Sequence, residues 1–227
     1  MSDQQAAAAP DVATLTIGIL GGTGDQGRGL ARRLALAGNP VIIGSRSAER
    51  AVAAAQDLGA DLGIRGMANP AAAAAADVVI VAVPWEGHGD LLRSLAATLA
   101  GKIVIDCVNP LGFDQRGCHP LPVAEGSAAE QAAAVLPDSV VVGAFHHVSA
   151  VLLLDPEVAS VELDVLVLGD DRSATDLVQA LAARIPGARG VYAGRLRNCG
   201  QVEAFTANLV SINRRYKAHA GLRITDV

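Results

Sequence analysis

Short apolar, β-branched segments recur along the chain and alternate with segments of helical periodicity. The apolar runs cover residues 15–20, 41–43, 78–83, 103–105 and 140–142. None of them alternates polar with apolar residues, so we expect parallel strands that are covered on both faces. Because helical patterns separate most of the runs, the order predicts right-handed βαβ units in an open, doubly wound α/β sheet.

Local signals place two of the expected helices. Ser47 stands where it can N-cap a helix that holds residues 50–58. Asn69 and Pro70 precede the alanine run of residues 71–76, and we expect them to be the N-cap and the first residue of a second helix.

The chain beyond Ala150 has its own, smaller pattern. It predicts a strand at 165–168, a helix at 173–184, a short strand at 190–194 and a long helix at 198–218. This part is too short for a large second domain, so we expect a small C-terminal α/β extension that adds to the sheet and lays a helix over the ligand cleft. The predicted divisions are a flexible tail (residues 1–11), a nucleotide-binding domain (12–150) and a C-terminal domain (151–227).

The first apolar run leads directly into a glycine motif. Gly22, Gly24 and Gly27 form G-x-G-x-x-G, and a helical pattern covers residues 26–36. Glycine lets the backbone turn sharply and approach a pyrophosphate, whose charge meets the positive end of the helix. A strand, turn and helix in this order predict a Rossmann-type dinucleotide-binding domain.

The end of the second strand indicates which dinucleotide binds. NAD-specific proteins carry an acidic residue there for the ribose 2′-hydroxyl. This chain has Ser45 and Arg46, with Arg50 one helical turn onward. A hydroxyl and two guanidinium groups suit a 2′-phosphate, so we expect NADP. The alternative is a structural glycine turn with two arginines on the surface.

Composition excludes several classes of protein. Of the 227 residues 51% are hydrophobic, yet charges, Pro or Gly interrupt every apolar run before it could span a membrane. The net charge of −5 argues against a general affinity for nucleic acid. Three cysteines in no metal-binding spacing suit reduced thiols, and no signal peptide is evident, so we expect a cytoplasmic protein without a metal.

Two more strand ends carry candidate ligand contacts. Pro84 and Trp85 follow the run at 78–83 and should border the dinucleotide, although Trp85 could instead pack on the following helix. Asn109 follows the run at 103–105. Its amide could bond the nicotinamide carboxamide or a ribose, but Asn-Pro is also an ordinary turn signal.

Acid–base groups are scarce. His146 and His147 follow the last run. Neighbouring side chains point in opposite directions, and no Asp, Glu or Cys lies nearby at the spacing of metal ligands, so the pair is not expected to bind a metal. His146 could donate to a substrate carbonyl or move a proton, or it could be structural. The chain has no Tyr-x-x-x-Lys pair. This absence favours hydride transfer between two organic cofactors, for which the protein supplies alignment.

Several of these segments together resemble one family, the NADPH-dependent reductases of coenzyme F420, an 8-hydroxy-5-deazaflavin. The matching pieces are G-G-T-G-x-x-G-x-G-L-A at 21–31, V-I-I-G-S-R at 41–46, G-M-x-N at 66–69, V-P-W-E at 83–86, the segment 146–150 and N-x-x-x-V-E at 198–203. The resemblance implies reversible hydride transfer between NADPH and F420.

The resemblance also implies roles for individual residues. Those expected to hold the pyrophosphate are Thr23, Gly24, Asp25 and Gln26. Those expected to line the nicotinamide are Trp85, Leu111 and Ala150. Those expected to border the deazaflavin are His146, Val148 and Ala150. His147 and Ser149 depart from the Thr and Pro of other members, so the deazaflavin contacts are less firmly implied than the NADP contacts.

Three further expectations remain. A homodimer built on the C-terminal helix is expected. One alternative activity is that of an NADP-dependent Rossmann reductase of a small imine, keto acid or flavin. Another is a protein that senses NADP without turnover, which the missing acid–base pair would also allow.

Overall fold

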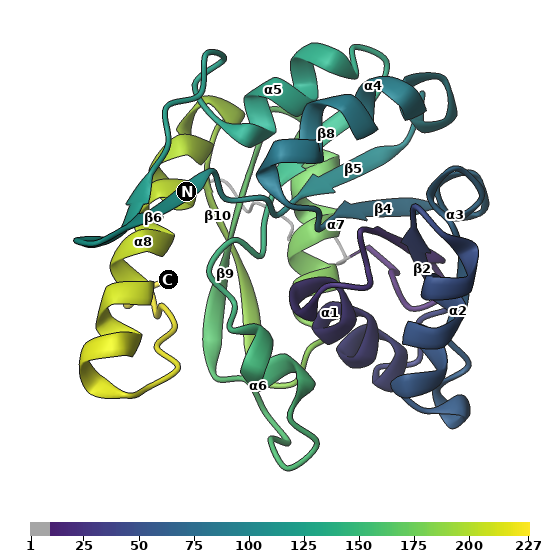
Figure 1. The fold of residues 1–227 in the computed structure, drawn as a ribbon, viewed down its shortest axis with the longest axis horizontal. Helices are drawn as coiled ribbons and strands as arrows, with labels where there is room; N and C mark the ends of the chain where they lie inside the picture. Colours follow the sequence, from purple (N-terminus) through teal and green to yellow (C-terminus); the bar gives the residue numbers. More distant parts are fainter. Residues whose placement is uncertain (1–9) are drawn as a thin grey trace, which may run out of the picture.

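The computed structural model describes residues 10–227, so most of the predicted tail lies outside the described residues. One eight-stranded sheet runs through the molecule in the order β10-β9-β8-β5-β4-β1-β2-β3 (Figure 1). Its strands are β1 (Ile17–Leu20), β2 (Val41–Ser45), β3 (Arg65–Ala68), β4 (Val78–Val81), β5 (Ile103–Asp106), β8 (Val140–Gly143), β9 (Leu163–Gly169) and β10 (Ala188–Gly194).

Helices cover both faces of this sheet. They are α1 (Asp25–Leu36), α2 (Ala48–Asp57), α3 (Asn69–Ala75), α4 (His88–Leu99), α5 (Ala128–Val135), α6 (Ala150–Leu154), α7 (Arg172–Ala182) and α8 (Cys199–Tyr216). One buried core joins the sheet to α1, α2, α6 and α7, and a second core joins it to α3, α4, α5 and α8. The predicted doubly wound α/β architecture is confirmed.

The strands expected from the first five apolar runs are all present and parallel. Strand order reverses between β1 and β4, and the carboxyl ends of these two strands therefore flank the crevice where such sheets bind ligands. β9 joins the sheet antiparallel to β8, and β10 is parallel to β9. The C-terminal part thus extends the same sheet.

Two helix starts test the local signals. Ser47 caps α2 as expected, because its side chain accepts a hydrogen bond from the Arg50 N–H. The prediction for the next helix was displaced by one residue. α3 begins at Asn69 itself, its N-cap is Ala68, and the Asn69 side chain makes no capping bond.

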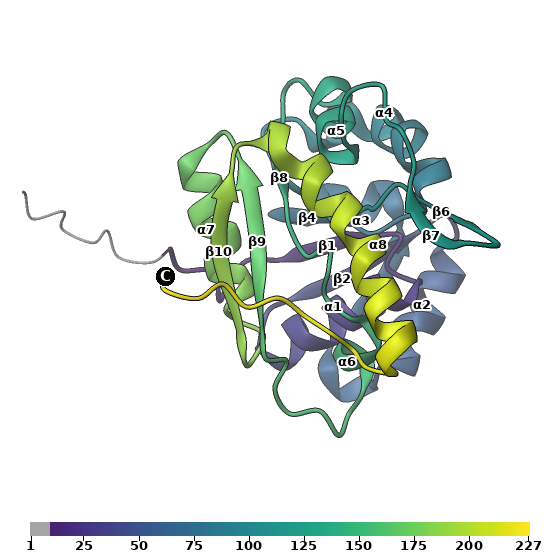
Figure 2. The ribbon, with the colours of Figure 1, turned by 90° about the vertical axis from the view of Figure 1, so that its left-hand side faces the viewer.

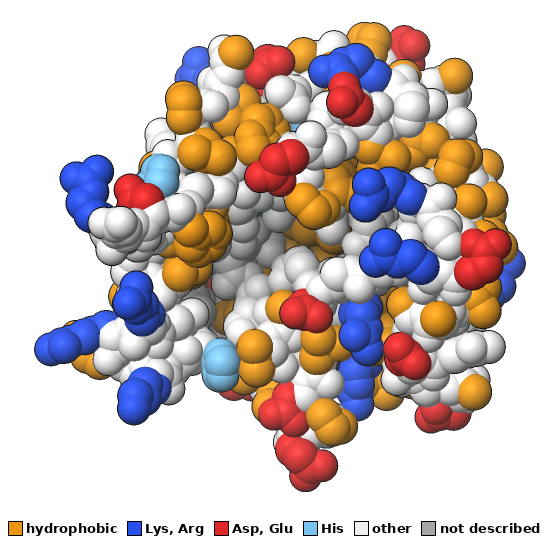
Figure 3. All heavy atoms as spheres, viewed as in Figure 1, with side chains coloured by type: hydrophobic (Ala, Val, Ile, Leu, Met, Phe, Trp, Pro, Cys, Tyr) orange, Lys and Arg blue, Asp and Glu red, His pale blue; other side chains and the backbone are white. Residues whose placement is uncertain are grey.

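A two-stranded hairpin and α8 form the side of the molecule opposite α2. The hairpin consists of β6 (Leu111–Asp114) and β7 (Gly117–Pro120). α8 packs against β7 and α5, and it crosses in front of the sheet in Figure 2. Between this side and the nucleotide-binding half, the surface is hollowed in Figure 3. No helix of residues 10–227 is long and apolar enough to cross a membrane.

Candidate active site

The glycine turn after β1 combines tight packing with one open position. A Cβ on Gly22 would lie 2.8 Å from the Ile19 carbonyl oxygen, and one on Gly27 would lie 2.6 Å from the Gly22 Cα. At Gly24 the nearest atom would be 3.8 Å away. Gly22 and Gly27 therefore allow the turn to pack on itself, while Gly24 leaves its backbone accessible.

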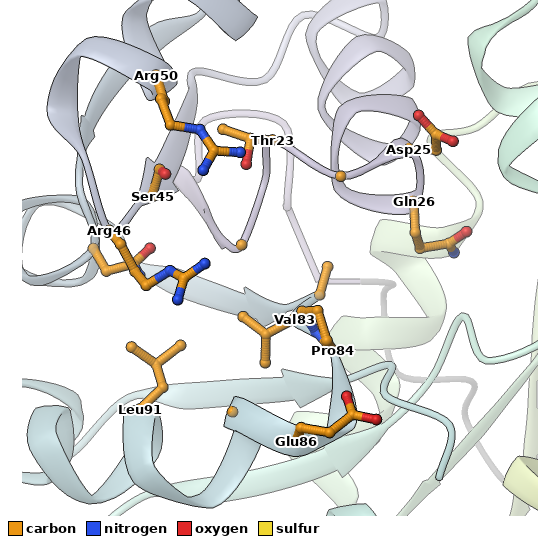
Figure 4. Close-up of a pocket in the computed structure, with 15 residues that line it drawn as sticks. Thr23, Asp25, Gln26, Ser45, Arg46, Arg50, Val83, Pro84, Glu86 and Leu91 are labelled. Carbon is orange, nitrogen blue, oxygen red and sulfur yellow. The ribbon is translucent and has the colours of Figure 1, made fainter. Parts of the chain in front are cut away.

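The helix that follows this turn has an open N-terminus. α1 begins at Asp25, with Gly24 in the N-cap position and no described side chain capping it. Its first N–H groups therefore face the space in front of the turn, where the helix dipole favours an anion. Thr23, Gly24, Asp25 and Gln26 line a cavity of about 710 Å³ at this point (Figure 4).

Basic groups lie at the other end of the same cavity. Ser45 is the last residue of β2 and is buried, whereas Arg46 and Arg50 are exposed. Arg46 points into the cavity and Arg50 points toward Thr23 (Figure 4). A hydroxyl and two cations therefore line the same cavity as the open end of α1, although the whole chain carries a net charge of −5.

A second cavity, of about 320 Å³, adjoins the first. The two cavities share four lining residues, namely Gln26, Ala82, Val83 and Pro84. The other residues around the second cavity are Trp85, Cys107, Val108, Asn109, His146, Val148 and Thr206. They come from the ends of β4, β5 and β8 and from α8, so the second cavity continues the first at the carboxyl ends of the strands.

The segment after β8 is held in an unusual backbone conformation. Phe145 is fully buried and has φ of 64°, in the left-handed region that non-glycine residues seldom adopt. Its carbonyl accepts a hydrogen bond from Gln26 Nε2 at 3.2 Å. The His146 carbonyl accepts one from Asn109 Nδ2 at 2.7 Å and another from Thr206 Oγ1 at 3.3 Å. These bonds fix the turn that places His146 at the cavity.

The His146 side chain has no partner within residues 10–227. It is 4% exposed, and neither ring nitrogen makes a hydrogen bond in the described chain. Burial lowers the pKa of His146 to about 4, so the ring is neutral at physiological pH, with one donor and one acceptor nitrogen. Both ring nitrogens are shielded from solvent, so the imidazole borders the second cavity without presenting either nitrogen to it.

His147 faces away from that cavity. Its Nε2 accepts a hydrogen bond from the Leu166 N–H at 3.5 Å, and burial lowers its pKa to about 4. Adjacent residues of this segment thus turn to opposite sides. Among residues 10–227 no group of His, Cys, Asp or Glu side chains could hold a metal ion.

Trp85 lies in a short 3₁₀ turn, Trp85–Gly87, between β4 and α4. It is half-buried, and its ring centroid lies 5.6 Å from that of His88, the first residue of α4. His88 is fully buried and bonds Asp106 at the end of β5. Burial opposes the charged ring, but Asp106 and Gln131 together raise the pKa of His88 above its ordinary value.

A buried carboxyl group ties α8 to α5. Glu203 accepts hydrogen bonds from the N–H groups of Ala128 and Ala129, at 2.9 and 3.2 Å, at the start of α5. Burial raises the pKa of Glu203 to about 7. Thr206, one turn further along α8, is thereby held at the second cavity.

The structure does not bring every expected residue to the cavities. Among the described residues, neither Leu111 nor Ala150 lines either one, because Leu111 opens β6 and Ala150 opens α6. Conversely, Thr206 and Asn69 line cavities without having been expected to. Thr206 is a polar residue in a helical pattern and carried no signal, whereas the G-M-x-N motif did mark Asn69.

Both cavities lie where the strand order of the doubly wound sheet reverses. The open N-terminus of α1, the arginines at the end of β2 and the adjoining second cavity are the features of a Rossmann-type dinucleotide-dependent oxidoreductase. Residues 16–110 match the family model described as "NADP oxidoreductase coenzyme F420-dependent". Because relatives of that family are about 40% identical over nearly the whole chain, the chain belongs to the family of F420-dependent NADP reductases.

Individual relatives support this membership. The F420-dependent NADP reductase of Methanothermobacter marburgensis is 41% identical over 94% of this chain and 99% of its own. The one of Methanocaldococcus jannaschii is 39% identical over the same shares. A solved structure from Arthrobacter sp. FB24, described as "a putative f420 dependent nadp-reductase", covers 93% of this chain and 99% of its own with a TM-score of 0.77 and 26% identity.

Proposed function

We propose that this protein transfers a hydride reversibly between NADPH and coenzyme F420. The observation that carries the proposal is the pair of adjoining cavities, which share Gln26, Ala82, Val83 and Pro84. In the reaction, the C4–H bond of NADPH breaks with its electron pair and a C–H bond forms at C5 of the deazaflavin. NADPH is oxidised, and a proton from water completes the reduced F420.

The first cavity is assigned to NADP. Its pyrophosphate would lie against the turn from Thr23 to Gln26, at the open N-terminus of α1. Its 2′-phosphate would lie with Ser45, Arg46 and Arg50, which offer charge-assisted hydrogen bonds. A free 2′-hydroxyl has no charge to meet these arginines, so the site favours NADP over NAD.

The second cavity is assigned to the two reacting rings. Pro84, Trp85 and Asn109 would border the nicotinamide. His146 and Val148 would border the deazaflavin. Leu111 and Ala150 do not line this cavity, so their expected contacts with the two rings have no support from its lining. The lowered pKa of His146 keeps its ring neutral, so it adds no charge beside the reacting rings.

The C-terminal part contributes to this pocket through α8. Thr206 closes the second cavity, and its hydroxyl also bonds the His146 carbonyl. This contact supports a division into an NADP-binding part, residues 12–150, and a part that completes the substrate pocket, residues 151–227.

A homodimer through the same side of the molecule is part of the proposal. Phe205, Ile212 and Tyr216 on α8 and Phe113 on the hairpin are exposed apolar side chains. Such side chains are typical of a protein interface. Light scattering should give twice the monomer mass of 23.0 kDa. We also place the protein in the cytoplasm, which suits its three free thiols.

The activity is tested by mixing the protein with NADPH and oxidised F420. Loss of the visible absorbance of the deazaflavin supports the proposal, and a much slower loss with NADH supports the assignment of the basic end. Turnover of a small imine, a keto acid or a flavin with none of F420 would favour a related reductase. NADP binding without turnover of any acceptor would favour a sensor.

A further inference from the structure

Asn69 is a buried polar residue whose side chain has no structural task. It is 4% exposed, and its Oδ1 has no hydrogen-bond partner among residues 10–227. It does not cap α3, although it stands at the start of that helix. An unpaired buried amide costs stability, so its place needs an explanation.

The surroundings of Asn69 connect it to the proposed NADP site. Asn69 lines the same cavity as Ser45, Arg46 and Arg50. It directly follows Ala68, which pairs in register with Ser45 on the neighbouring strand. The Asn69 carboxamide therefore lies next to the residues that would hold the 2′-phosphate.

Gly44 makes room for this carboxamide. A Cβ at position 44 would lie 2.8 Å from Asn69 Oδ1 and 3.1 Å from the Ala72 Cβ. The Gly44 carbonyl also accepts a hydrogen bond from the Gly22 N–H at 3.0 Å, which ties β2 to the glycine turn. Asn69 thus forms part of the cavity wall between the glycine turn and the basic end.

We propose that Asn69 is a cofactor-binding residue whose carboxamide, in which Oδ1 faces Gly44 in the free protein, turns about its terminal bond when NADP binds, so that Oδ1 accepts a hydrogen bond from the ribose 3′-hydroxyl in the adenosine half. This inference rests on the proposed NADP site. A side-chain carbonyl oxygen requires a donor, and the phosphates of NADP offer only acceptors. The 3′-hydroxyl is on the carbon next to the one that carries the 2′-phosphate, so it comes with the phosphate to this end of the cavity. The adenine 6-amino group is the other donor of the adenosine half.

The first test is NADP⁺ affinity by calorimetry, without F420. Asn69→Ala should weaken binding about five-fold, the worth of one neutral hydrogen bond. Gln56→Ala is the matched control, because it removes an exposed carboxamide on α2, and it should leave affinity unchanged. Adenosine 2′,5′-bisphosphate, which keeps the adenosine half and lacks nicotinamide, should show the same ratio. Unchanged affinity of Asn69→Ala would overturn the inference.

The second test separates binding from folding. Because Oδ1 is unpaired in the free protein, Asn69→Ala should unfold without ligand at the same temperature as the wild type or higher, yet gain less from added NADP⁺. A lower melting temperature of the free variant, together with an undiminished gain from NADP⁺, would assign Asn69 a structural role and contradict the proposal.

A third arm identifies the donor. The hypoxanthine analogue of NADP⁺ lacks the adenine amino group, and the loss from Asn69→Ala should persist with it. If the loss vanished with this analogue, the amino group would be the partner and the ribose assignment would be wrong. Arg46→Ala separates a failure of the proposed NADP site from a failure of the Asn69 assignment. If it leaves NADP⁺ affinity unchanged, the proposed site itself fails, whereas a strong loss there with none at Asn69 refutes this inference alone.

Discussion

The Nε2 atom of His88 lies 2.6 Å from the Oδ2 atom of Asp106, and both side chains are fully buried. The other ring nitrogen of His88 faces Gln131 Oε1 at 3.1 Å. Gln131 donates its own amide to Glu125, which fixes this orientation. Since both ring nitrogens face acceptors, the contacts favour the protonated ring and raise the pKa of His88, and the pair joins the start of α4 to the end of β5.

The first prediction concerns pH and stability. The folded protein raises the pKa of His88 above 6.5, so its contribution to the unfolding free energy is fully present below pH 6.5 and is lost as pH rises through the raised value. His88→Gln should remove this part of the decline in urea titrations from pH 6 to 9. His219→Gln, at an exposed position, should retain it. Equal pH dependence in the two variants would be incompatible with the ion pair.

A second prediction separates two glycines of the same motif. Gly24→Ala places a methyl group in open space where the pyrophosphate would lie. KM for NADPH should rise about ten-fold, as expected when one or two hydrogen bonds to the pyrophosphate are lost, and Tm should change little. Gly27→Ala forces a Cβ to 2.6 Å from the Gly22 Cα and should lower Tm. Similar Tm losses in both variants would show that the turn has been misassigned.

A third prediction concerns residues 152–158, which include the end of α6 and follow the turn at His146. Arg33 is 3% exposed and donates to the carbonyls of Leu153, Val158, Leu152 and Asp155 at 2.6–3.2 Å. Arg33→Met should reduce the unfolding free energy by about 2–4 kcal/mol, because the carbonyls at the end of α6 lose their donor. Arg32→Met, one residue away, changes the same charge without these bonds. Comparable losses in the two variants would rule out this role.

A fourth prediction tests cofactor preference. Ser45→Glu should weaken NADPH relative to NADH, since a carboxylate repels the 2′-phosphate and accepts the free 2′-hydroxyl. The ratio of kcat/KM for the two cofactors measures the change, and about a hundred-fold shift is expected for one repelled phosphate. Ser94→Glu is the control, because it adds the same charge at an exposed position of α4 outside the cavity lining. An unchanged ratio in Ser45→Glu would refute the assignment of the β2 end.

Much of the nucleotide-binding half is predictable from local patterns. The runs of β1, β4 and β5 are continuous and apolar because both faces of each strand are covered, and the Ser47 cap is a local signal. β3 and the β6–β7 hairpin escaped prediction. Their residues are mostly half-buried or exposed, so no apolar run marks them.

The residues of the candidate site likewise divide into those that local sequence predicts and those that it does not. The glycine turn and Ser45-Arg46 are set by neighbours in sequence, and the structure places them around one cavity. Thr206 reaches the second cavity only because α8 packs across the sheet, and Phe145 adopts its left-handed backbone in a folded context that its sequence does not reveal. Contacts between distant segments carried no signal in the pattern of a single chain.

The central claim, direct hydride transfer between the two rings, is tested by following an isotope. NADPH carrying deuterium at C4, prepared separately as each of its two stereoisomers, is mixed with oxidised F420 and the protein in ordinary water. Mass spectrometry of the reduced F420 should show one deuterium from one stereoisomer and none from the other, because the cavity walls hold the nicotinamide with one face toward the deazaflavin. Reduced F420 without deuterium from either stereoisomer would contradict direct transfer.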